Sequence, residues 1–236
     1  MAQKILIIVP AYNEESNIGK TIDDIMASGQ TATILVVNDC SKDQTAQKVL
    51  EKSVMLISLP YNLGIGGAVQ TGFRYADDNH YDVAVQIDGD YQHDAAYLKD
   101  LLRPLCDDKV DMTIGSRFLP PFSSYQSSFL RRFGITFFAR LISFLIKEHI
   151  TDPTSGYRAF NKKLIKIFAK YYPHDFPEPE AILIAKRYKA RIKEIPVQMR
   201  ERLGGQSSIR YLKTFYYMVK VTLAIVLDKL KERKEL

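Results

Sequence analysis

Tryptophan is absent from this chain of 236 residues, and cysteine occurs only twice, at Cys40 and Cys106. Two cysteines build neither a disulfide framework nor a cysteine-based zinc site, so a reducing compartment is the simpler expectation. Long apolar runs are also missing, because none reaches the ~18 uninterrupted apolar residues of a membrane-spanning helix. The two nearest stretches, 133–146 and 215–227, are each interrupted by a basic residue. The apolar run at 5–9 is too short for the core of a signal peptide.

No strong excess of one charge is present either. The 33 basic and 27 acidic residues leave a net charge of +6, and 46% of the residues are hydrophobic. This composition is that of an ordinary globular protein and excludes a disordered, collagen-like or low-complexity chain. A modest positive charge suits anionic lipids and phosphates. Nucleic acid is not an expected partner, because no module of interleaved basic and aromatic residues is present.

Short β-branched runs alternate with helical patterns through the first half of the chain. The runs lack polar alternation, which predicts strands covered on both faces, at 5–9, 33–37, 54–59, 83–87 and 112–114. Helices are predicted between them at 15–27, 45–52, 66–77 and 95–105. This order predicts an α/β fold with a mostly parallel sheet flanked by helices.

The second half is predicted to be mainly helical. Helical patterns occupy 127–147, 161–170, 181–188 and 208–231, and 192–199 reads as a strand. No linker or internal repeat divides the chain, so one domain spanning 1–236 is expected. Its functional residues should lie just after the strands, because open parallel sheets bind ligands beyond the carboxyl ends of their strands.

The segment Asp88-Gly89-Asp90 directly follows the predicted strand at 83–87. In extended backbone, residues two apart point the same way, so both carboxylates would face one pocket. Together with Gln92 they would offer the hard oxygen ligands that Mg²⁺ or Mn²⁺ prefers. The alternative is a solvated turn that caps the following helix, with His93 and Asp94 at its start.

A glycine-rich segment at 62–68 lies between a predicted strand and a predicted helix. Its N–H groups, that of Gly64 among them, could approach a phosphate or a nucleoside closely. The alternative is a tight turn with close packing of helix on sheet. A dinucleotide-dependent dehydrogenase is disfavoured, because Val69 occupies the third glycine position of that fingerprint.

Ordered segments of the first half resemble the family 2 glycosyltransferases of the GT-A fold. The matching segments are Pro10-Ala11-Tyr12-Asn13-Glu14-Glu15, Val36-Val37-Asn38-Asp39, Asn62-Leu63-Gly64, Asp88-Gly89-Asp90 and Gly115-Ser116-Arg117. A closer resemblance is to the polyprenyl-phosphate sugar transferases, the branch of the dolichyl-phosphate mannose synthases. It rests on Gln86-Ile87-Asp88-Gly89-Asp90-Tyr91-Gln92-His93, on Gly115-Ser116-Arg117 and on Arg202-Leu203-Gly204-Gly205-Gln206-Ser207. The resemblance implies a Rossmann-like, mostly parallel sheet, C-terminal amphipathic helices and hexosyltransferase activity.

The same resemblance implies a division of labour, with the donor bound by about 1–117 and the acceptor and membrane faced by about 118–236. The nucleotide sugar would be held by Pro10, Tyr12, Glu14, Asp39, Gly64, Asp88 and Arg202. A divalent cation, Mg²⁺ or Mn²⁺, would be held by Asp88, Asp90 and Gln92. The phosphate of a lipid acceptor would be received by Ser116, Arg117 and Arg131. The family usually carries lysine after Ser207, where this chain has Ser208, and Arg210 is the candidate replacement.

The acceptor decides whether a base is needed. A polyprenyl phosphate is already an anion, whereas a sugar hydroxyl must lose a proton to a general base. For a hydroxyl acceptor the base would be Asp152 or Glu180. The alternatives are that Asp152 caps the turn before Pro153 and that Glu180, with Glu178, favours the start of a helix.

Membrane contact is the last expectation. The stripe formed by Phe133, Phe137, Leu141, Phe144 and Leu145 would either pack on the sheet or lie in the lipid interface. The resemblance implies a cytoplasmic enzyme, peripheral on the inner face of the cell membrane, with a small membrane-protein partner as a hypothesis. A uridine-diphosphate sugar is the favoured donor and GDP-mannose the runner-up. Two other functions stay open: transfer to a hydroxyl of a cell-envelope glycan, and a non-catalytic nucleotide-binding module.

Overall fold

The computed structural model describes residues 3–107, 109–122, 129–174 and 177–200, with side chains from residue 134 onward in the third range. Within these ranges, seven strands form one sheet in the order β3-β2-β1-β4-β6-β5-β7. The strands are β1 Ile5–Ala11, β2 Thr33–Asn38, β3 Met55–Ser58, β4 Val83–Gln86, β5 Met112–Ser116, β6 Arg158–Asn161 and β7 Ile192–Pro196. All pairings are parallel except those that β6 makes with β4 and β5.

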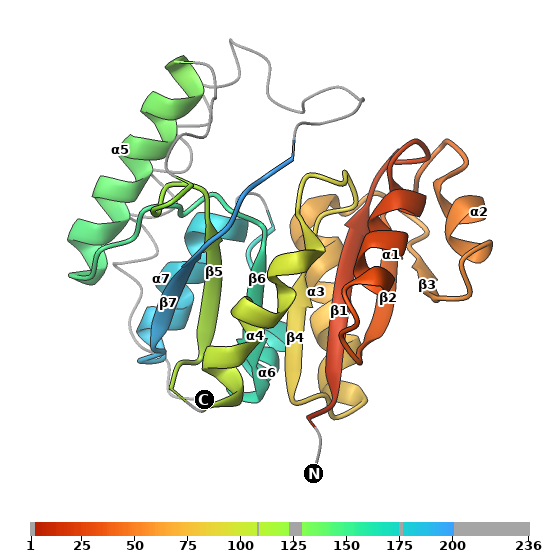
Figure 1. The fold of residues 1–236 in the computed structure, drawn as a ribbon. Helices are drawn as coiled ribbons and strands as arrows, with labels where there is room; N and C mark the ends of the chain where they lie inside the picture. The colour runs from red at the N-terminus through yellow and green to blue at the C-terminus, as the bar shows by residue number, and fades with distance from the viewer. Residues whose placement is uncertain (1–2, 108, 123–128, 175–176, 201–236) are drawn as a thin grey trace.

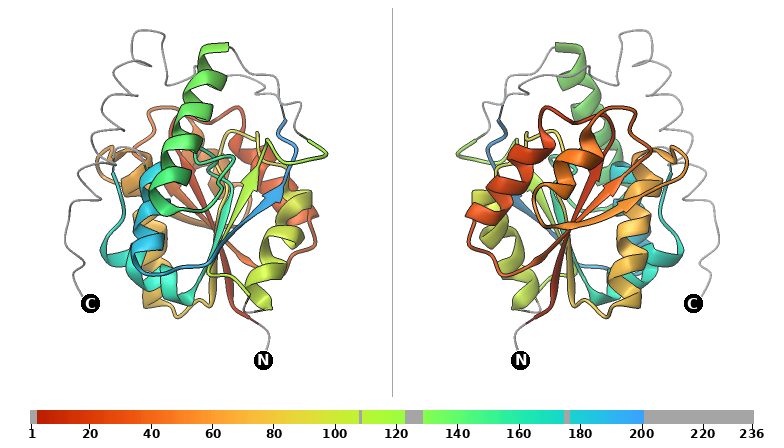
Figure 2. Two further views of the ribbon diagram at one scale, coloured as in Figure 1. Left: turned by 90° about the vertical axis from the view of Figure 1, so that its left-hand side faces the viewer. Right: turned by 90° about the vertical axis from the view of Figure 1, so that its right-hand side faces the viewer.

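Helices cover both faces of this sheet (Figure 2). They are α1 Ile18–Ala27, α2 Thr45–Leu50, α3 Gly64–Asp78, the short η1 Ala95–Tyr97, α4 Leu98–Cys106, α5 Phe129–Ile146, α6 Lys162–Lys170 and α7 Pro177–Arg187. Alternate residues of β1 enter two separate cores. Leu6 and Ile8 pack with α3, α6 and α7, whereas Ile7 and Val9 pack with α1 and α4. The predicted α/β fold, with a mostly parallel sheet flanked by helices, is confirmed.

Two strand predictions are wrong. The strand β6 was not predicted at all, because a four-residue strand that contains a buried arginine has no apolar run to reveal it. The strand β3 was predicted to be covered on both faces, yet Met55 is 39% exposed. The reason is position, because among the described strands β3 lies at the edge of the sheet and pairs with β2 alone.

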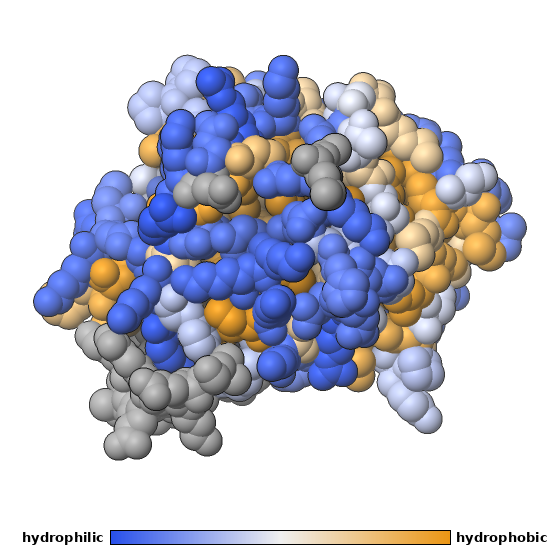
Figure 3. Space-filling model, turned by 90° about the horizontal axis from the view of Figure 1, so that it is seen from below, coloured by the Kyte–Doolittle hydropathy of each residue, from blue (hydrophilic) through white to orange (hydrophobic). Residues whose placement is uncertain are grey.

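The carboxyl ends of the parallel strands meet at the upper edge of the sheet in Figure 1, and α5 rises beside that edge. The opposite end, seen from below in Figure 3, presents mainly hydrophilic side chains. Within the described part of the chain, no helix has the length and apolar character needed to cross a membrane. The predicted helix at 208–231 lies outside the described residues.

Candidate active site

The loop at 88–93 begins two residues after β4 ends at Gln86. Its backbone stays tied to β1, since the amide of Gly89 donates to the carbonyl of Pro10 at 3.2 Å. The Asp88 carboxylate accepts a hydrogen bond from Gln86 Nε2 at 3.3 Å and contacts His93 Nε2 at 3.1 Å. Its side chain is 34% exposed. Asp88 is therefore held on two sides and open on a third.

The second carboxylate of the pair lies in a turn. Asp90 Oδ1 accepts from the amide of Gln92 at 3.1 Å, and Tyr91 adopts a left-handed backbone with φ of 64°. β4 ends before Asp88, so strand alternation does not by itself set the directions of the two carboxylates, and their shared orientation stays a prediction. The helix start that the alternative put at His93 and Asp94 is confirmed, since Asp94 caps η1 through the amide of Ala96 at 3.0 Å.

Two neighbours that the sequence analysis did not count among the site residues, His93 and Gly156, shape this loop. His93 is 2% exposed, and its ring packs in a tilted arrangement, 4.9 Å between centroids, against Tyr157, whose hydroxyl donates to the Asp94 carbonyl. A Cβ at Gly156 would lie 2.6 Å from Asp88 Oδ2, so only glycine leaves room for the carboxylate. The polar turn at 151–156, visible in the sequence, was the available signal for Gly156.

Arg158 is a further residue that the sequence analysis missed. It is fully buried on β6, opposite Gln86 in the register, and donates to the carbonyls of Pro153, Ser155 and Glu178 at 2.6–2.8 Å. Burial raises the pKa of the Asp88 carboxyl. The hydrogen bonds from His93 and Gln86 and the charge of Arg158 outweigh burial and hold that pKa below its usual value. Asp88 is thus an anion at neutral pH.

The loop fits an incomplete divalent metal site. An ionised carboxylate has about four lone-pair positions, and one protein contact on each Asp88 oxygen leaves others for a cation. No cluster of three or more His, Cys, Asp or Glu side chains in the described ranges could hold a metal by itself. A cation bound here would therefore need further oxygens, such as those of a substrate diphosphate.

The residues predicted to bind the nucleotide differ in their exposure and in their hydrogen-bond partners. Asp39 is 3% exposed, and its two oxygens accept from the amides of Leu63 at 2.7 Å and Gly64 at 2.9 Å. The structure thus gives the Gly64 amide to Asp39, at the start of α3, and not to a ligand phosphate as expected. Pro10 is buried within β1, whereas Tyr12 is 45% exposed at its end.

Glu14 is half-buried, and its carboxylate accepts from Asn17 Nδ2 at 2.8 Å. Gln92, the third predicted metal ligand, is also half-buried, and its carbonyl accepts from the amide of Arg200 at 2.9 Å. The side chain of Arg131, on α5, and the whole of 202–210 lie outside the described residues.

Arg117 and Asp152, predicted as separate acceptor residues, form one buried ion pair. Arg117 Nε lies 2.6 Å from Asp152 Oδ2 and Nη2 lies 2.7 Å from Oδ1, with exposed side-chain fractions of 3% and 0%. β7 holds the loop that contains Asp152, because Glu194 on that strand accepts hydrogen bonds from the amides of Thr151 and Asp152 at 2.8 Å. Ser116 is buried, with its hydroxyl 2.6 Å from that of Thr151.

The acidic residues of α7 lie in its first turn, where the capping alternative put them. The helix begins at Pro177 and not at 181, because proline is tolerated in a first turn. Burial raises the pKa of the Glu178 carboxyl more than the charge of Arg158 lowers it. Glu180 is half-buried.

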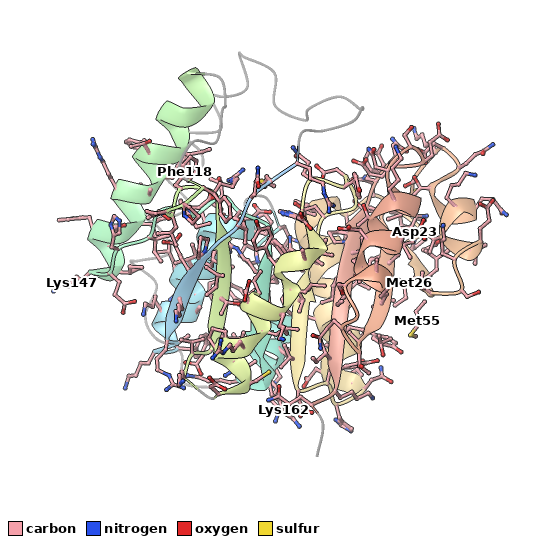
Figure 4. All side chains as sticks on the ribbon, in the orientation of Figure 1. Asp23, Met26, Met55, Phe118, Lys147 and Lys162 are labelled. Carbon is pink, nitrogen blue, oxygen red and sulfur yellow. The ribbon has the colours of Figure 1, made fainter. Side chains whose placement is uncertain are left out.

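The exposure of side chains along the long helix α5 bears on both alternatives for its apolar stripe. Ile135, Phe138 and Ile142 are buried, whereas Phe137 is 37% and Phe144 is 78% exposed. Figure 4 shows Phe118 beside α5 at the upper edge of the sheet, and its ring lies 5.7 Å from the Arg117 guanidinium. Part of the helix packs on the fold, and another part leaves aromatic rings uncovered.

Comparison with known proteins places this geometry in a family. The model of glycosyl transferase family 2 matches residues 6–168. UDP-N-acetylglucosamine–dolichyl-phosphate N-acetylglucosaminyltransferase of Methanococcus voltae is 29% identical over 97% of this chain and 100% of its own length. Undecaprenyl-phosphate mannosyltransferase of Micrococcus luteus is 28% identical over 87% of each chain.

Among solved structures, glucosyl-3-phosphoglycerate synthase of Mycobacterium tuberculosis, determined with Mn²⁺, UDP-glucose and phosphoglyceric acid, matches with a TM-score of 0.75. It is 19% identical, over 97% of this chain and 80% of its own. That likeness confirms the expected GT-A-like fold, and the family match makes a non-catalytic binding module the wrong alternative. The chain belongs to glycosyl transferase family 2 and is a glycosyltransferase.

Proposed function

We propose that this enzyme transfers a sugar from a nucleotide-diphosphate donor to a polyprenyl phosphate, with a divalent cation at Asp88, Asp90 and Gln92. The observation that carries the proposal is the Asp88 carboxylate, ionised and fixed by His93 and Gln86 yet one-third exposed at the carboxyl end of β4. The relatives named above act on dolichyl and undecaprenyl phosphate, and the structural neighbour was solved with Mn²⁺ and UDP-glucose.

The chemistry assigns different tasks to the metal and to the chain. When bound, Mg²⁺ or Mn²⁺ would neutralise the charge that develops on the departing nucleotide diphosphate. His93 and Gln86 fix the direction of the Asp88 carboxylate, and Gly156 leaves the space that this carboxylate occupies. The protein thus holds its anionic oxygens in place before the donor arrives, which lowers the cost of reorganisation.

The buried pair favours a phosphate acceptor over a hydroxyl acceptor. Asp152 is fully buried and bonded on both oxygens by Arg117, so it is poorly placed to take a proton from a substrate. A polyprenyl phosphate needs no such base. Glu180 stays the base of the competing hydroxyl hypothesis. We propose that Arg117 orders the loop through Asp152, which leaves Arg131 as the candidate for direct contact with the lipid phosphate.

Fewer observations support the choice of donor than support the choice of acceptor. A UDP-sugar is favoured by the name of the Methanococcus relative, and GDP-mannose is the runner-up. Asp39 was expected to help hold the nucleotide sugar, but its two oxygens already accept the amides of Leu63 and Gly64 at the start of α3. Tyr12 is the most exposed of the predicted nucleoside contacts that the structure describes, and it is our candidate for contact with the base.

One assay tests donor, acceptor and metal together. Radiolabelled UDP-sugars and GDP-mannose are offered with undecaprenyl phosphate or with a lipid-linked sugar hydroxyl, with Mn²⁺ or with excess chelator. We expect metal-dependent transfer to the phosphate and a loss of about 10²–10³-fold in kcat/KM for Asp90→Asn. The control is Asp23→Asn, since Asp23 lies on α1 with a side chain 58% exposed and paired with Lys52 (Figure 4). Full activity in chelator, or transfer to the hydroxyl alone, would contradict the proposal.

Membrane association is the second part of the proposal, with α5 lying on the cytoplasmic surface of the cell membrane. Phe144 is 78% exposed and Phe137 is 37% exposed on the same helix, with Arg140 exposed between them. Such a helix places rings in lipid and cations at headgroups.

Sedimentation with vesicles of phosphatidylglycerol and phosphatidylcholine tests this assignment. We expect Phe144→Ser to bind about tenfold more weakly, since burying a phenylalanine side chain contributes about 1.5–3 kcal/mol. The control is Leu50→Ser, because Leu50 is 62% exposed on α2. Equal binding by both variants would refute the role of α5. No binding by the wild-type chain would instead favour recruitment by a small membrane-protein partner.

A further inference from the structure

Arg200 joins the end of the described chain to the 88–93 loop. Figure 1 shows the chain after β7 passing the upper edge of the sheet toward the loops above β4. There Met199 forms an isolated antiparallel bridge with His93, and the amide of Arg200 donates to the carbonyl of Gln92 at 2.9 Å. The backbone at 199–200 therefore pairs with the segment that carries a predicted metal ligand.

The Arg200 side chain makes four kinds of contact with the same region. Its Nη1 and Nη2 donate to Asp24 Oδ2 at 2.7 Å and Oδ1 at 2.9 Å, which is a bidentate ion pair. Nη2 also lies 2.9 Å from Asp94 Oδ1, and Nη1 donates to the His93 carbonyl at 3.4 Å. The guanidinium stacks 4.5 Å from the centroid of the Tyr91 ring. These contacts already engage the cation, which argues against a direct role on a substrate phosphate.

The contacts converge on consecutive residues of the loop and its exit. Tyr91, which needs a left-handed backbone, lies under the guanidinium. Ala95, just beyond the loop, is tied to the same anchor, because its amide donates to Asp24 Oδ2 at 2.9 Å. Without Arg200, the carboxylates of Asp24 and Asp94 would repel each other and the anions of the loop.

We propose that Arg200, anchored by Asp24, is a positioning residue that holds the 88–93 loop in its metal-binding conformation. The inference rests on the proposed use of a divalent cation. Residues behind the ligands of a metal typically change its affinity by about 10–100-fold when they are removed. Arg200 acts from behind Tyr91 and Gln92, on the side of α1 and η1, while His93 and Gln86 hold Asp88.

The test measures metal binding apart from turnover. Titration calorimetry with Mn²⁺ in the presence of UDP, and the electron paramagnetic resonance of free Mn²⁺, are applied to Arg200→Ala, Arg200→Lys and Arg191→Ala. Arg191 is the matched control, an arginine just before β7 whose side chain is 59% exposed and pairs with Asp111. We expect at least a tenfold rise in the Kd for Mn²⁺ in Arg200→Ala and no change in Arg191→Ala. Arg200→Lys should recover only part, since lysine cannot make the bidentate pair.

Two further results separate a positioning role from general loss of structure. At saturating Mn²⁺ the kcat of Arg200→Ala should return to within about threefold of wild type, and its urea midpoint should match that of Arg191→Ala. Asp24→Asn should raise the Kd as well, and the double variant should add little, because both changes break one contact. Equal Mn²⁺ affinity in wild type and Arg200→Ala would overturn this inference alone. Failure of the wild type to bind Mn²⁺ with UDP would overturn the proposed function with it.

Discussion

Asp88 and Asp152 are two carboxylates of one sheet edge, and the charge of Arg158 acts on both. Asp88 has a histidine and an amide as partners and keeps a third of its side chain exposed. Asp152 has a bidentate guanidinium and no exposed surface. The contrast separates a carboxylate that can bind a ligand from one that holds the fold. Both were candidates in sequence, and only their partners distinguish them.

Removing the guanidinium from the buried pair should have the largest effect on stability. Arg117→Ala leaves the Asp152 charge buried and unpaired, so we expect the free energy of unfolding to fall by about 3–5 kcal/mol. Urea unfolding followed by circular dichroism measures it. The control is Lys109→Ala, since Lys109 pairs with Asp107 on the surface and is 72% exposed, and it should cost at most about 1 kcal/mol.

A variant that fails to fold alone is checked by removing both charges. Arg117→Met combined with Asp152→Leu should be more stable than Arg117→Ala, because a buried pair replaced by apolar side chains leaves no orphaned charge. If Arg117→Ala lost less than about 1 kcal/mol, Asp152 would have another source of compensation, and its exclusion as a base would no longer hold.

The first half of the chain, which we propose binds the donor, was the more predictable half. Its strands β1, β2 and β4 are mainly apolar runs, so the run itself marks the strand and its end marks the loop of the candidate site. The second half contributes a strand to the same sheet that no apolar run marks. Its strand β6 runs antiparallel and contains Arg158, which donates to carbonyls of the preceding turn, at Pro153 and Ser155, and to that of Glu178 in α7. No apolar run marks such a strand, because its buried arginine is satisfied by backbone carbonyls that the sequence pattern does not show.

Prediction of the candidate site from the sequence also fails where the partners are far apart in the chain. Asp88, Asp90 and Gln92 are near neighbours in the chain, so the sequence suffices to group them. The pairs Asp39–Gly64 and Arg117–Asp152 join residues 25 and 35 positions apart. Each member carries a charge or a special backbone that resembles a ligand site when taken alone. In the folded protein these groups bind each other, and only the tertiary structure shows that they do.

The smallest change that tests the contrast is one methyl group at Gly156. A Cβ there would meet Asp88 Oδ2 at 2.6 Å and Oδ1 at 2.9 Å, so the carboxylate must turn away from its bonds to His93 and Gln86. We expect Gly156→Ala to weaken Mn²⁺ binding in the presence of UDP by about tenfold, measured by calorimetry, and to cost about 1–3 kcal/mol of stability. Gly19→Ala is the control. Gly19 lies on α1, and a Cβ there would meet only Lys52 Cε, at 3.7 Å. That variant should gain about 0.4–1 kcal/mol and keep its metal affinity. Should both variants bind Mn²⁺ equally, the fixed direction of Asp88 would have no part in metal binding.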